Sequence, residues 1–371
     1  MPALKVYVLV ILSLLLSGYV PTPSFGSSTT AQAAIANALR WLDANQNPDG
    51  SYSSTPQYYQ HWAAAAAYAL WLNSSSSPEA SRAYSWVASQ MDNSSSGTWY
   101  EADIPGAILY SLAASENLGL MHNSSDYTAL RNFQQSNGGF AGFAEPPTYA
   151  PVASVVDTSM ALWGLIHAKA VNASSQEDAA RYLFSLQNTA DGSFALTSNT
   201  VYNKLESLAP DPISLTALTL VVLKDASYAP SDSRISLGLD YLEKAVSASF
   251  KSSVDPSNST GHVYAASLAA IAFTDYGRNH DALASIPFII AMQNADGGFH
   301  DESRGSTGSN ALDTAWAAIA LQLVPPGPEF GAYLPQLVIF GTIAGIAALA
   351  VIVGVVVYFV KRNKTQTPLS L

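Results

Sequence analysis

The sequence predicts an all-α protein in which six helical pairs close into a ring, followed by one C-terminal transmembrane helix. A Gln–turn–Gly–aromatic pattern recurs along the middle of the chain, at steps of roughly 44 to 53 residues. An apolar helix follows each turn, and a more amphipathic helix precedes it. An uncharged apolar stretch near the C-terminus is followed at once by basic residues.

The repeat joins a helix end to a glycine turn and an aromatic residue. We expect its Gln to bond free backbone groups at the helix end and its Gly to supply the positive φ of a tight turn. Weaker copies run over 86–99 and 241–250, so six copies fit the chain. The four good copies carry Gln46, Gln135, Gln187 and Gln293. The apolar helices are expected at 62–72, 107–112, 157–165, 214–223, 263–273 and 313–321.

The Gln–turn–Gly–aromatic element resembles the repeat of squalene and oxidosqualene cyclases and the related repeat of protein prenyltransferase β subunits. The resemblance covers about 30–321, and its best copies are 180–194 and 288–299. It implies an (α/α)6 toroid with a central cavity, in a terpenoid cyclase-like family. The cyclase motif D-x-D-D-T-A survives only as Asp313-Thr314-Ala315, with Leu312 in the position of the proton donor. The prenyltransferase zinc site needs a cysteine, and this chain has none.

The two ends of the chain predict export and membrane anchoring. A short apolar core behind Lys5 predicts a signal peptide over 1–26, with an uncleaved N-terminal anchor as the alternative. Residues 337–360 carry no charge and are numerous enough to cross a bilayer. The basic residues of the tail, 361–371, place the C-terminus inside the cell. We therefore expect a single-pass type I membrane protein, with the toroid (27–325) outside the cell and a Pro/Gly linker over 326–336.

Composition narrows the partners and the chemistry. The formal net charge is −11, and no basic stripe interrupts the acidic ectodomain, so we expect no nucleic-acid partner. The absence of cysteine excludes disulfides and thiolate ligands, and the six histidines show no metal-ligand spacing, so no metal or cofactor is expected. Asn-x-Ser/Thr sequons predict a glycoprotein, at Asn73, Asn93, Asn123, Asn172 and Asn258.

Acidic residues precede several of the apolar helices, namely Asp103, Asp157, Asp211 and Asp313. One interpretation is a ring of carboxylates at one mouth of the cavity, able to perform general acid–base chemistry as in glycoside hydrolysis. The other is helix N-capping. Because these residues recur with the repeat, the sequence favours capping.

Residues that depart from the repeat are further candidates. Glu145 lies in a long Pro-rich loop, and His300 is followed by Asp301 and Glu302. A plainer interpretation is open for each candidate, as a solvated loop residue or a core aromatic. The candidate catalytic residues are Asp313, Asp157, Glu101, His61 and His300. The candidate ligand-binding residues are Trp62, Trp163, Trp316, Tyr100 and Tyr149.

Three functions remain open at this stage. The first is a surface module that binds a hydrophobic molecule, a glycan or a peptide in the central cavity. The second is an enzyme, either a divergent terpenoid cyclase relative or a carbohydrate-active barrel, and the third is a structural cell-surface protein. Converging carboxyls in the cavity favour an enzyme or a polar ligand, an apolar cavity favours a lipid, and a filled cavity favours the structural role.

Overall fold

A computed structural model describes residues 27–52, 60–93, 97–122, 125–145, 150–198, 211–251, 262–301 and 308–324. Most of them belong to one compact unit that spans Thr29–Pro325. The expected signal peptide, transmembrane helix and tail lie outside the described residues, as do Tyr149, Asn123 and Asn258. No helix in the described ranges is long and apolar enough to cross a membrane.

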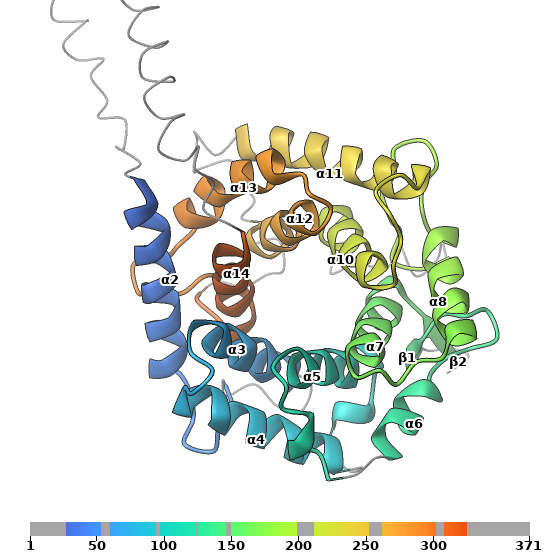
Figure 1. Ribbon diagram of the computed structural model, residues 1–371, viewed down its shortest axis with the longest axis horizontal. Coiled ribbons are helices and arrows are strands. Elements are labelled where there is room, and N and C mark those ends of the chain that lie inside the picture. The colour runs from blue at the N-terminus through green and yellow to red at the C-terminus, as the bar shows by residue number, and fades with distance from the viewer. Residues whose placement is uncertain are drawn as a thin grey trace, which may run out of the picture. The chain divides into compact units, whose positions relative to one another are not determined.

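The described helices form two concentric rings (Figure 1). The inner ring consists of α3 (Gln60–Asn73), α5 (Asp103–Ala114), α7 (Val155–His167), α10 (Pro212–Asp225), α12 (Val263–Asp275) and α14 (Ala311–Leu323). The outer ring consists of α2 (Ser27–Ala44), α4 (Pro78–Asp92), α6 (Ser125–Arg131), α8 (Ala173–Ser185), α11 (Ser233–Lys251) and α13 (Asn279–Ala291). Each inner helix packs on the next, and α14 packs on α3. The all-α toroid expected from the sequence is therefore present.

Small residues explain why the inner helices pack so closely. In α3 the run from Ala63 to Ala67 is buried on every face, which is typical of a helix covered on all sides. Between α5 and α7 the backbones touch through two glycines. A Cβ atom on Gly106 would lie 2.5 Å from the backbone of Met160, and one on Gly164 would lie 2.3 Å from the Gly106 carbonyl oxygen. No other residue type fits at either position.

The repeat glutamines fasten each pair of helices to the next, as expected from the need to satisfy helix ends. Each Gln side chain donates to the carbonyl of its turn glycine and to a carbonyl on the following outer helix. The prediction was wrong for Gln135, whose side chain donates to the Pro151 carbonyl at 2.7 Å. Its neighbour Gln134 makes the two contacts of the repeat instead. The contacts join Gln46 to Gly50 and Glu79, Gln134 to Gly138 and Ser175, Gln187 to Gly192 and Arg234, and Gln293 to Gly297 and Ala34.

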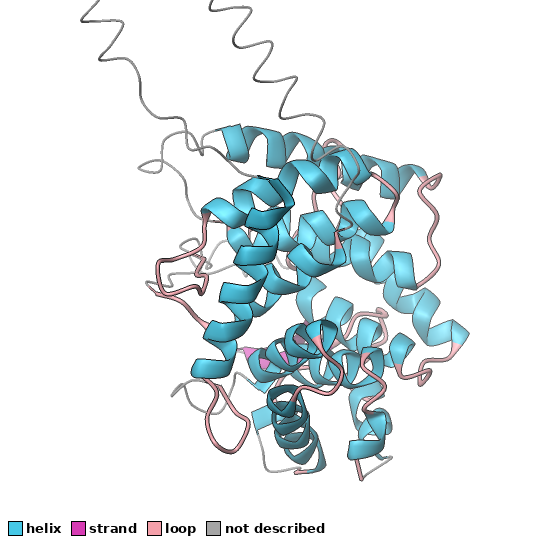
Figure 2. Cartoon of the chain, turned by 60° about the vertical axis from the view of Figure 1, so that its left-hand side comes forward, coloured by secondary structure: helices cyan, strands magenta, loops and turns pink. Residues whose placement is uncertain are grey.

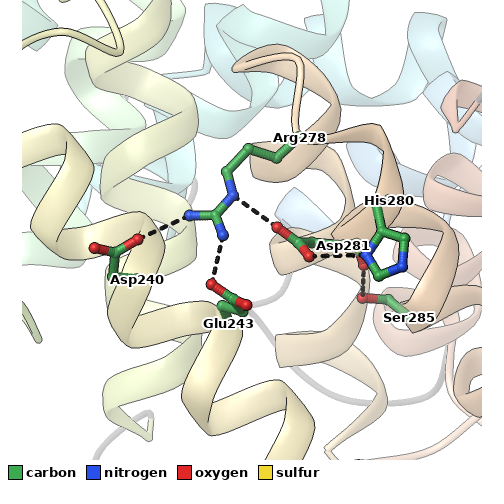
Figure 3. Close-up of polar contacts among 6 residues, drawn as sticks. All are labelled: Asp240, Glu243, Arg278, His280, Asp281 and Ser285. Atoms are coloured by element: carbon green, nitrogen blue, oxygen red, sulfur yellow. Dashed lines mark hydrogen bonds and ion pairs between the residues drawn. The ribbon is translucent and has the colours of Figure 1, made fainter.

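An ion-pair cluster links α11 to α13, where the repeat carries neither the Gln nor the Gly (Figure 3). The Arg278 guanidinium donates to Asp240 at 3.0 Å and to Glu243 at 2.5 Å, both on α11. It also donates to Asp281 in the first turn of α13, at 2.6 Å. One arginine therefore joins two outer helices by charge-assisted hydrogen bonds in place of the amide contact.

A small hairpin interrupts the helical pattern, and the sequence did not predict it (Figure 2). Strand β1 (Ala141–Glu145) pairs antiparallel with β2 (Ala150–Ala153), within the segment expected to be a Pro-rich loop. The Tyr182 hydroxyl on α8 donates to the Ala153 carbonyl at 2.5 Å. The hairpin is thus fixed by tertiary contacts from a neighbouring helix, which periodicity along the strand does not reveal. Two short 3-10 turns, η1 (Gly97–Trp99) and η2 (Leu118–Leu120), flank α5.

Candidate functional site

The inner ring encloses a cavity of about 340 Å³, within the size range of small-molecule sites. Every inner helix described above contributes to its lining. His61, Asp103 and Asp211 come from the N-terminal ends of α3, α5 and α10, and Asp301 comes from the loop before α14. Carboxyl groups therefore gather at the end of the cavity where the inner helices begin.

Asp103 is the first residue of α5, and its side chain lines the cavity. Its Oδ1 atom is buried and has no hydrogen-bond partner among the described residues. Burial raises the pKa of Asp103 well above its usual value, and the charges of Asp157 and Glu101 raise it further. The site therefore favours the protonated acid at this position.

Asp211 has a different environment on the neighbouring helix α10. It is the N-cap of α10, where its Oδ1 accepts from the Ser214 amide at 2.9 Å. Its Oδ2 lies 3.1 Å from Nδ1 of His262. The contact with Asp211 raises the pKa of His262, although burial opposes the change. The pair thus favours a charged imidazolium facing a carboxylate.

Asp301 and Asp313 are both almost fully buried, at 1% and 2% exposure. Asp301 lines the cavity and accepts from the Tyr264 amide at 3.0 Å, at the start of α12. Asp313 lies behind it and accepts from the Asp301 amide at 2.9 Å and from Asn310 Nδ2 at 2.5 Å. Asp313 therefore positions the loop that carries Asp301.

Asp157 acts in the same way on the other side of the ring. Its Oδ1 accepts from the amides of Ala102 and Asp103 at 3.1 and 3.3 Å, and Ser154 Oγ donates to its Oδ2 at 2.6 Å. Burial raises its pKa to about 7, against the lowering effect of these hydrogen bonds. Asp157 thus holds the start of α5, and with it Asp103, in place.

The predicted capping role is confirmed for Asp211 alone. The side chains that cap α7 and α14 are Ser154 and Asn310. Asp157 and Asp313 lie three residues further on, and each accepts a hydrogen bond from the side chain of its cap residue. The acid of a capping box accepts instead from the backbone amide of the cap. Asp103 begins α5 behind Ala102, which makes no side-chain cap bond. The sequence showed that acids recur at these helix starts, but the exact position within each first turn decided their roles.

The other predicted site residues divide between the cavity and its surroundings. His61 lines the cavity. The Trp62 ring lies edge-on to the His61 ring, and the two ring centroids are 6.4 Å apart. Glu101 is partly buried near Asp103 and Asp157, whose pKa values it raises. Tyr100 is 45% exposed, and His300 Nδ1 lies 2.9 Å from Asn294 Nδ2, so neither of these two lines the cavity. Glu302 is outside the described residues.

Aromatic rings form the floor of the cavity. Trp316, Tyr110 and Tyr68 contribute directly to its lining. Trp163, 2% exposed, lies beneath them, stacked on Tyr110 with centroids 3.6 Å apart and on Trp316 at 6.0 Å. Its indole N–H donates to Asp225 Oδ2 at 2.7 Å, which fixes the ring plane. Trp163 therefore supports the floor and does not itself line the cavity.

Sequence reasoning missed Tyr68, Tyr110 and Tyr264 as lining residues. Two of them carried a usable signal. Tyr68 lies seven residues after His61, and Tyr110 lies seven residues after Asp103, so each aromatic ring is on the same helix face two turns further in. No group of three or more His, Asp or Glu side chains in the described ranges is arranged to hold a metal ion.

The model of the A-macroglobulin TED domain family matches residues 110–298, just over half of the chain. The chain belongs to this family. The repeat had predicted relatives among cyclases and prenyltransferases instead. The family is one of thioester domains, and a thioester needs the sulfur atom of a cysteine. Because this TED-family chain contains no cysteine, its own side chains cannot form one.

Comparison with solved structures confirms the toroid fold that the repeat predicted. The type II terpene cyclase MstE from Scytonema matches with a TM-score of 0.57 at 15% identity, over 80% of this chain and 98% of the cyclase. A protein from Actinoplanes matches with a TM-score of 0.52 at 12% identity, over 79% and 98%. A glycosidase variant matches with a TM-score of 0.51 at 14% identity, over 80% and 98%. At these identities the likeness concerns the fold alone. No curated protein sequence matches the chain.

Proposed function

We propose that this toroid binds a small polar ligand in its central cavity. The observation that carries the proposal is the convergence of Asp103, Asp211 and Asp301 above an aromatic floor, in a space of about 340 Å³. Ligand sites combine an apolar wall with a few placed polar groups, and this cavity has that composition. Because the described side chains leave this space open, a purely structural ring is the weaker explanation.

A terpenoid ligand is less well supported than a polar one. The cyclase MstE is described in complex with geranylgeranyl dihydroxybenzoate, which carries a carboxylate. In this chain the cavity wall holds three carboxyl groups and no Lys or Arg among its described lining residues, so it offers a carboxylate ligand no such cationic partner. Leu312, at the position of the cyclase proton donor, lines the cavity and has no proton to give.

An enzyme is the second candidate, and the contrast between two carboxyls favours it. Asp103 is biased toward its protonated form, while Asp211 faces His262. Acids held in unlike environments are the arrangement that glycoside hydrolysis uses, one as acid and one as base or nucleophile. Hydrolysis of aryl glycosides that is lost in Asp103→Asn would favour this candidate over simple binding.

We also propose that the toroid is displayed outside the cell, on a single-pass anchor, with the membrane as its partner. The support is the uncharged stretch 337–360 and the basic tail that follows it. Glycosylation is supported by exposure: Asn73, Asn93 and Asn172 are all exposed, each at a helix end. Asn172 uses its Oδ1 to cap α8, which leaves its amide nitrogen available to a glycan.

The cavity proposal is tested with a substitution that fills the space. Ala107 lines the cavity, so Ala107→Phe places a ring within it, whereas Ala33→Phe adds the same ring to the exposed surface of α2. We expect ligands found by thermal shift against a library of polar metabolites to bind the full chain and Ala33→Phe, and not Ala107→Phe. Ligands that bind all three proteins equally would show that the cavity is not the site.

A further inference from the structure

We infer that the ligand of the central cavity is an organic cation, a compact ammonium or guanidinium compound. The inference rests on the proposed binding function and names the chemical class of its ligand. Three features of the cavity support it: the balance of charge in its wall, the shape of its aromatic floor, and one carboxyl oxygen that has no hydrogen-bond partner among the described residues.

The ionisable side chains in the cavity wall are mostly carboxyl groups. Asp103, Asp211 and Asp301 line it, and no Lys or Arg occurs among the described lining residues. Asp211 is matched by His262, and Asp301 by the Tyr264 amide. A buried carboxyl is costly unless it is paired, so the wall lacks one positive partner.

Asp103 is the residue that the positive group of a ligand would contact. Its Oδ1 atom is buried, lacks a hydrogen bond within the described part of the chain, and belongs to a side chain that lines the cavity. An ammonium or guanidinium group donates hydrogen bonds and supplies the missing charge at once. A neutral sugar supplies the hydrogen bond but not the charge.

The aromatic floor suits the rest of a cation. The ring planes of Tyr264 and Trp316 meet at 89°, and those of Tyr68 and Tyr110 at 71°. All four rings line the cavity, so alkyl groups around a positive nitrogen held there would contact aromatic atoms. Because Trp163 stacks beneath Tyr110 and Trp316, these faces are held in position.

Binding of a cation is coupled to release of a proton. The empty site raises the pKa of Asp103 through burial and through the charges of its neighbours, and a cation at its Oδ1 lowers that pKa again. Affinity for a cation therefore rises with pH until Asp103 is ionised without the ligand. The groups that face this region are Glu101 before α5, Asp157 on α7, His61 on α3, Asp211 beside His262, and Asp301 before α14.

The test compares choline with its uncharged isostere, 3,3-dimethylbutan-1-ol, by titration calorimetry on the full chain in a non-ionic detergent. Spermidine and agmatine extend the cations, and glucose serves as a neutral polyol. We expect at least one cation to bind at least about tenfold more tightly than the neutral compounds. We also expect weaker cation binding at pH 5 than at pH 8.

Two variants test whether the Asp103 carboxyl is the group that binds the cation. Asp103→Asn keeps the shape of the side chain and is expected to weaken cation binding at least about tenfold and to reduce its pH dependence. Asp43→Asn removes the same charge from an exposed position on α2 and is expected to leave binding unchanged. A thermal midpoint for each variant checks that it is folded.

The outcomes separate this inference from the proposed function. If glucose or the isostere binds as tightly as the cations, and Ala107→Phe abolishes that binding, the cavity is a ligand site but the cation inference is overturned. Equal cation affinity in wild type and Asp103→Asn also overturns it. If no ligand of either charge type binds in a manner sensitive to Ala107→Phe, both proposals fall.

Discussion

Asp275 ends α12, at the opposite end of the inner ring from the carboxyls of the cavity. Burial, with a smaller contribution from the charge of Asp225, raises its pKa to about 7, and Lys224 opposes the change. A helix C-terminus also disfavours negative charge. The Asp225 carboxylate is occupied by Trp163 and by His167, whose Nε2 lies 2.8 Å away. Asp275 is therefore a carboxyl that the fold favours as the neutral acid at pH values below about 7.

We expect Asp275→Asn to gain stability relative to wild type as pH rises from 5 to 8. A carboxyl whose pKa is raised in the folded protein contributes stability that is fully present below its unfolded pKa. That contribution is lost progressively as pH rises to the folded value of about 7. The relative gain between pH 5 and pH 8 is of order 2 kcal/mol, allowing for the partial exposure of the side chain.

Thermal midpoints of both proteins at pH 5 and pH 8 measure this effect. Asp43→Asn is the matched control, because it removes an exposed carboxyl and is expected to change stability equally at both values. A stabilisation by Asp275→Asn that does not depend on pH would contradict the assignment.

Side-chain roles at this scale were only partly predictable. Asp103 and Asp211 were named from the sequence because acids recur at the starts of the apolar helices, and His61 was named because it departs from the repeat. The lining by Tyr68 and Tyr110 was missed, since an aromatic residue in an apolar helix predicts core unless the facing elements are known.

At the scale of elements, the same kind of contact joins most successive outer helices, and a different contact replaces it between α11 and α13. Where the repeat is intact, a Gln amide links the turn to the next outer helix, and the turn glycine packs against that helix. Between α11 and α13 the amide is absent, and Arg278 bridges Asp240 and Glu243 to Asp281 (Figure 3). Uncharged joints are insensitive to salt, whereas the arginine joint is screened by it.

Substitution of two glycines by alanine can distinguish the cost of a left-handed backbone from the cost of a steric clash. Gly50 has φ +95°, and a Cβ there would lie 2.2 Å from the Arg82 carbonyl oxygen on α4. Gly277 has φ +74° and nothing within 4 Å of its Cβ position. We expect Gly277→Ala to cost about 1 kcal/mol for the left-handed backbone. Gly50→Ala is expected to cost at least about 3 kcal/mol, because the turn must also move away from α4.

Thermal or chemical unfolding of the two variants provides the comparison. Each serves as the control for the other, since both replace a glycine of positive φ by the same residue. Equal losses of stability would mean that contact between the turn and α4 contributes nothing at this joint.

The arrangement of the helices was more predictable from the sequence than the exact residue that makes each contact. Alternation of apolar and amphipathic helices gave the two rings, but the choice between Gln134 and Gln135 depended on the Gln134–Phe140 bridge, which only the folded turn reveals. The β1–β2 hairpin was missed because it is held from α8 and has little periodicity of its own.

For the molecule as a whole, the ring closes between its first and last helices. Gln293 donates to the Ala34 carbonyl at 2.9 Å, and the Trp41 indole donates to Asp296 at 3.1 Å. On the inner ring, Gln322 on α14 donates to the Ala69 carbonyl on α3 at 3.1 Å. Contacts between distant parts of the sequence thus form one seam, which involves α2, α3, α14 and the last turn.

We expect Gln293→Ala to open this seam locally. The variant leaves the Ala34 and Gly297 carbonyls without their donor, which costs about 1 to 3 kcal/mol if water does not replace it. Hydrogen exchange is expected to increase in α2 more than in α8. Gln187→Ala, which removes the equivalent contact within the ring, is the control and is expected to affect α11 instead. Unchanged exchange in α2 would show that the other seam contacts hold it.

The seam also means that, during synthesis of the chain, its two sides are made at different times. Gln293 lies 259 residues after Ala34, and ribosomes add about 5 to 20 residues per second, so α2 waits about 13 to 50 seconds for its partner. Throughout that interval the Ala34 carbonyl, on a helix whose side chains Ala34, Ala38 and Leu42 are buried in the finished ring, lacks the Gln293 donor. The first of the described helices is therefore among the last to gain all of its contacts, because one of its partners belongs to the final repeat.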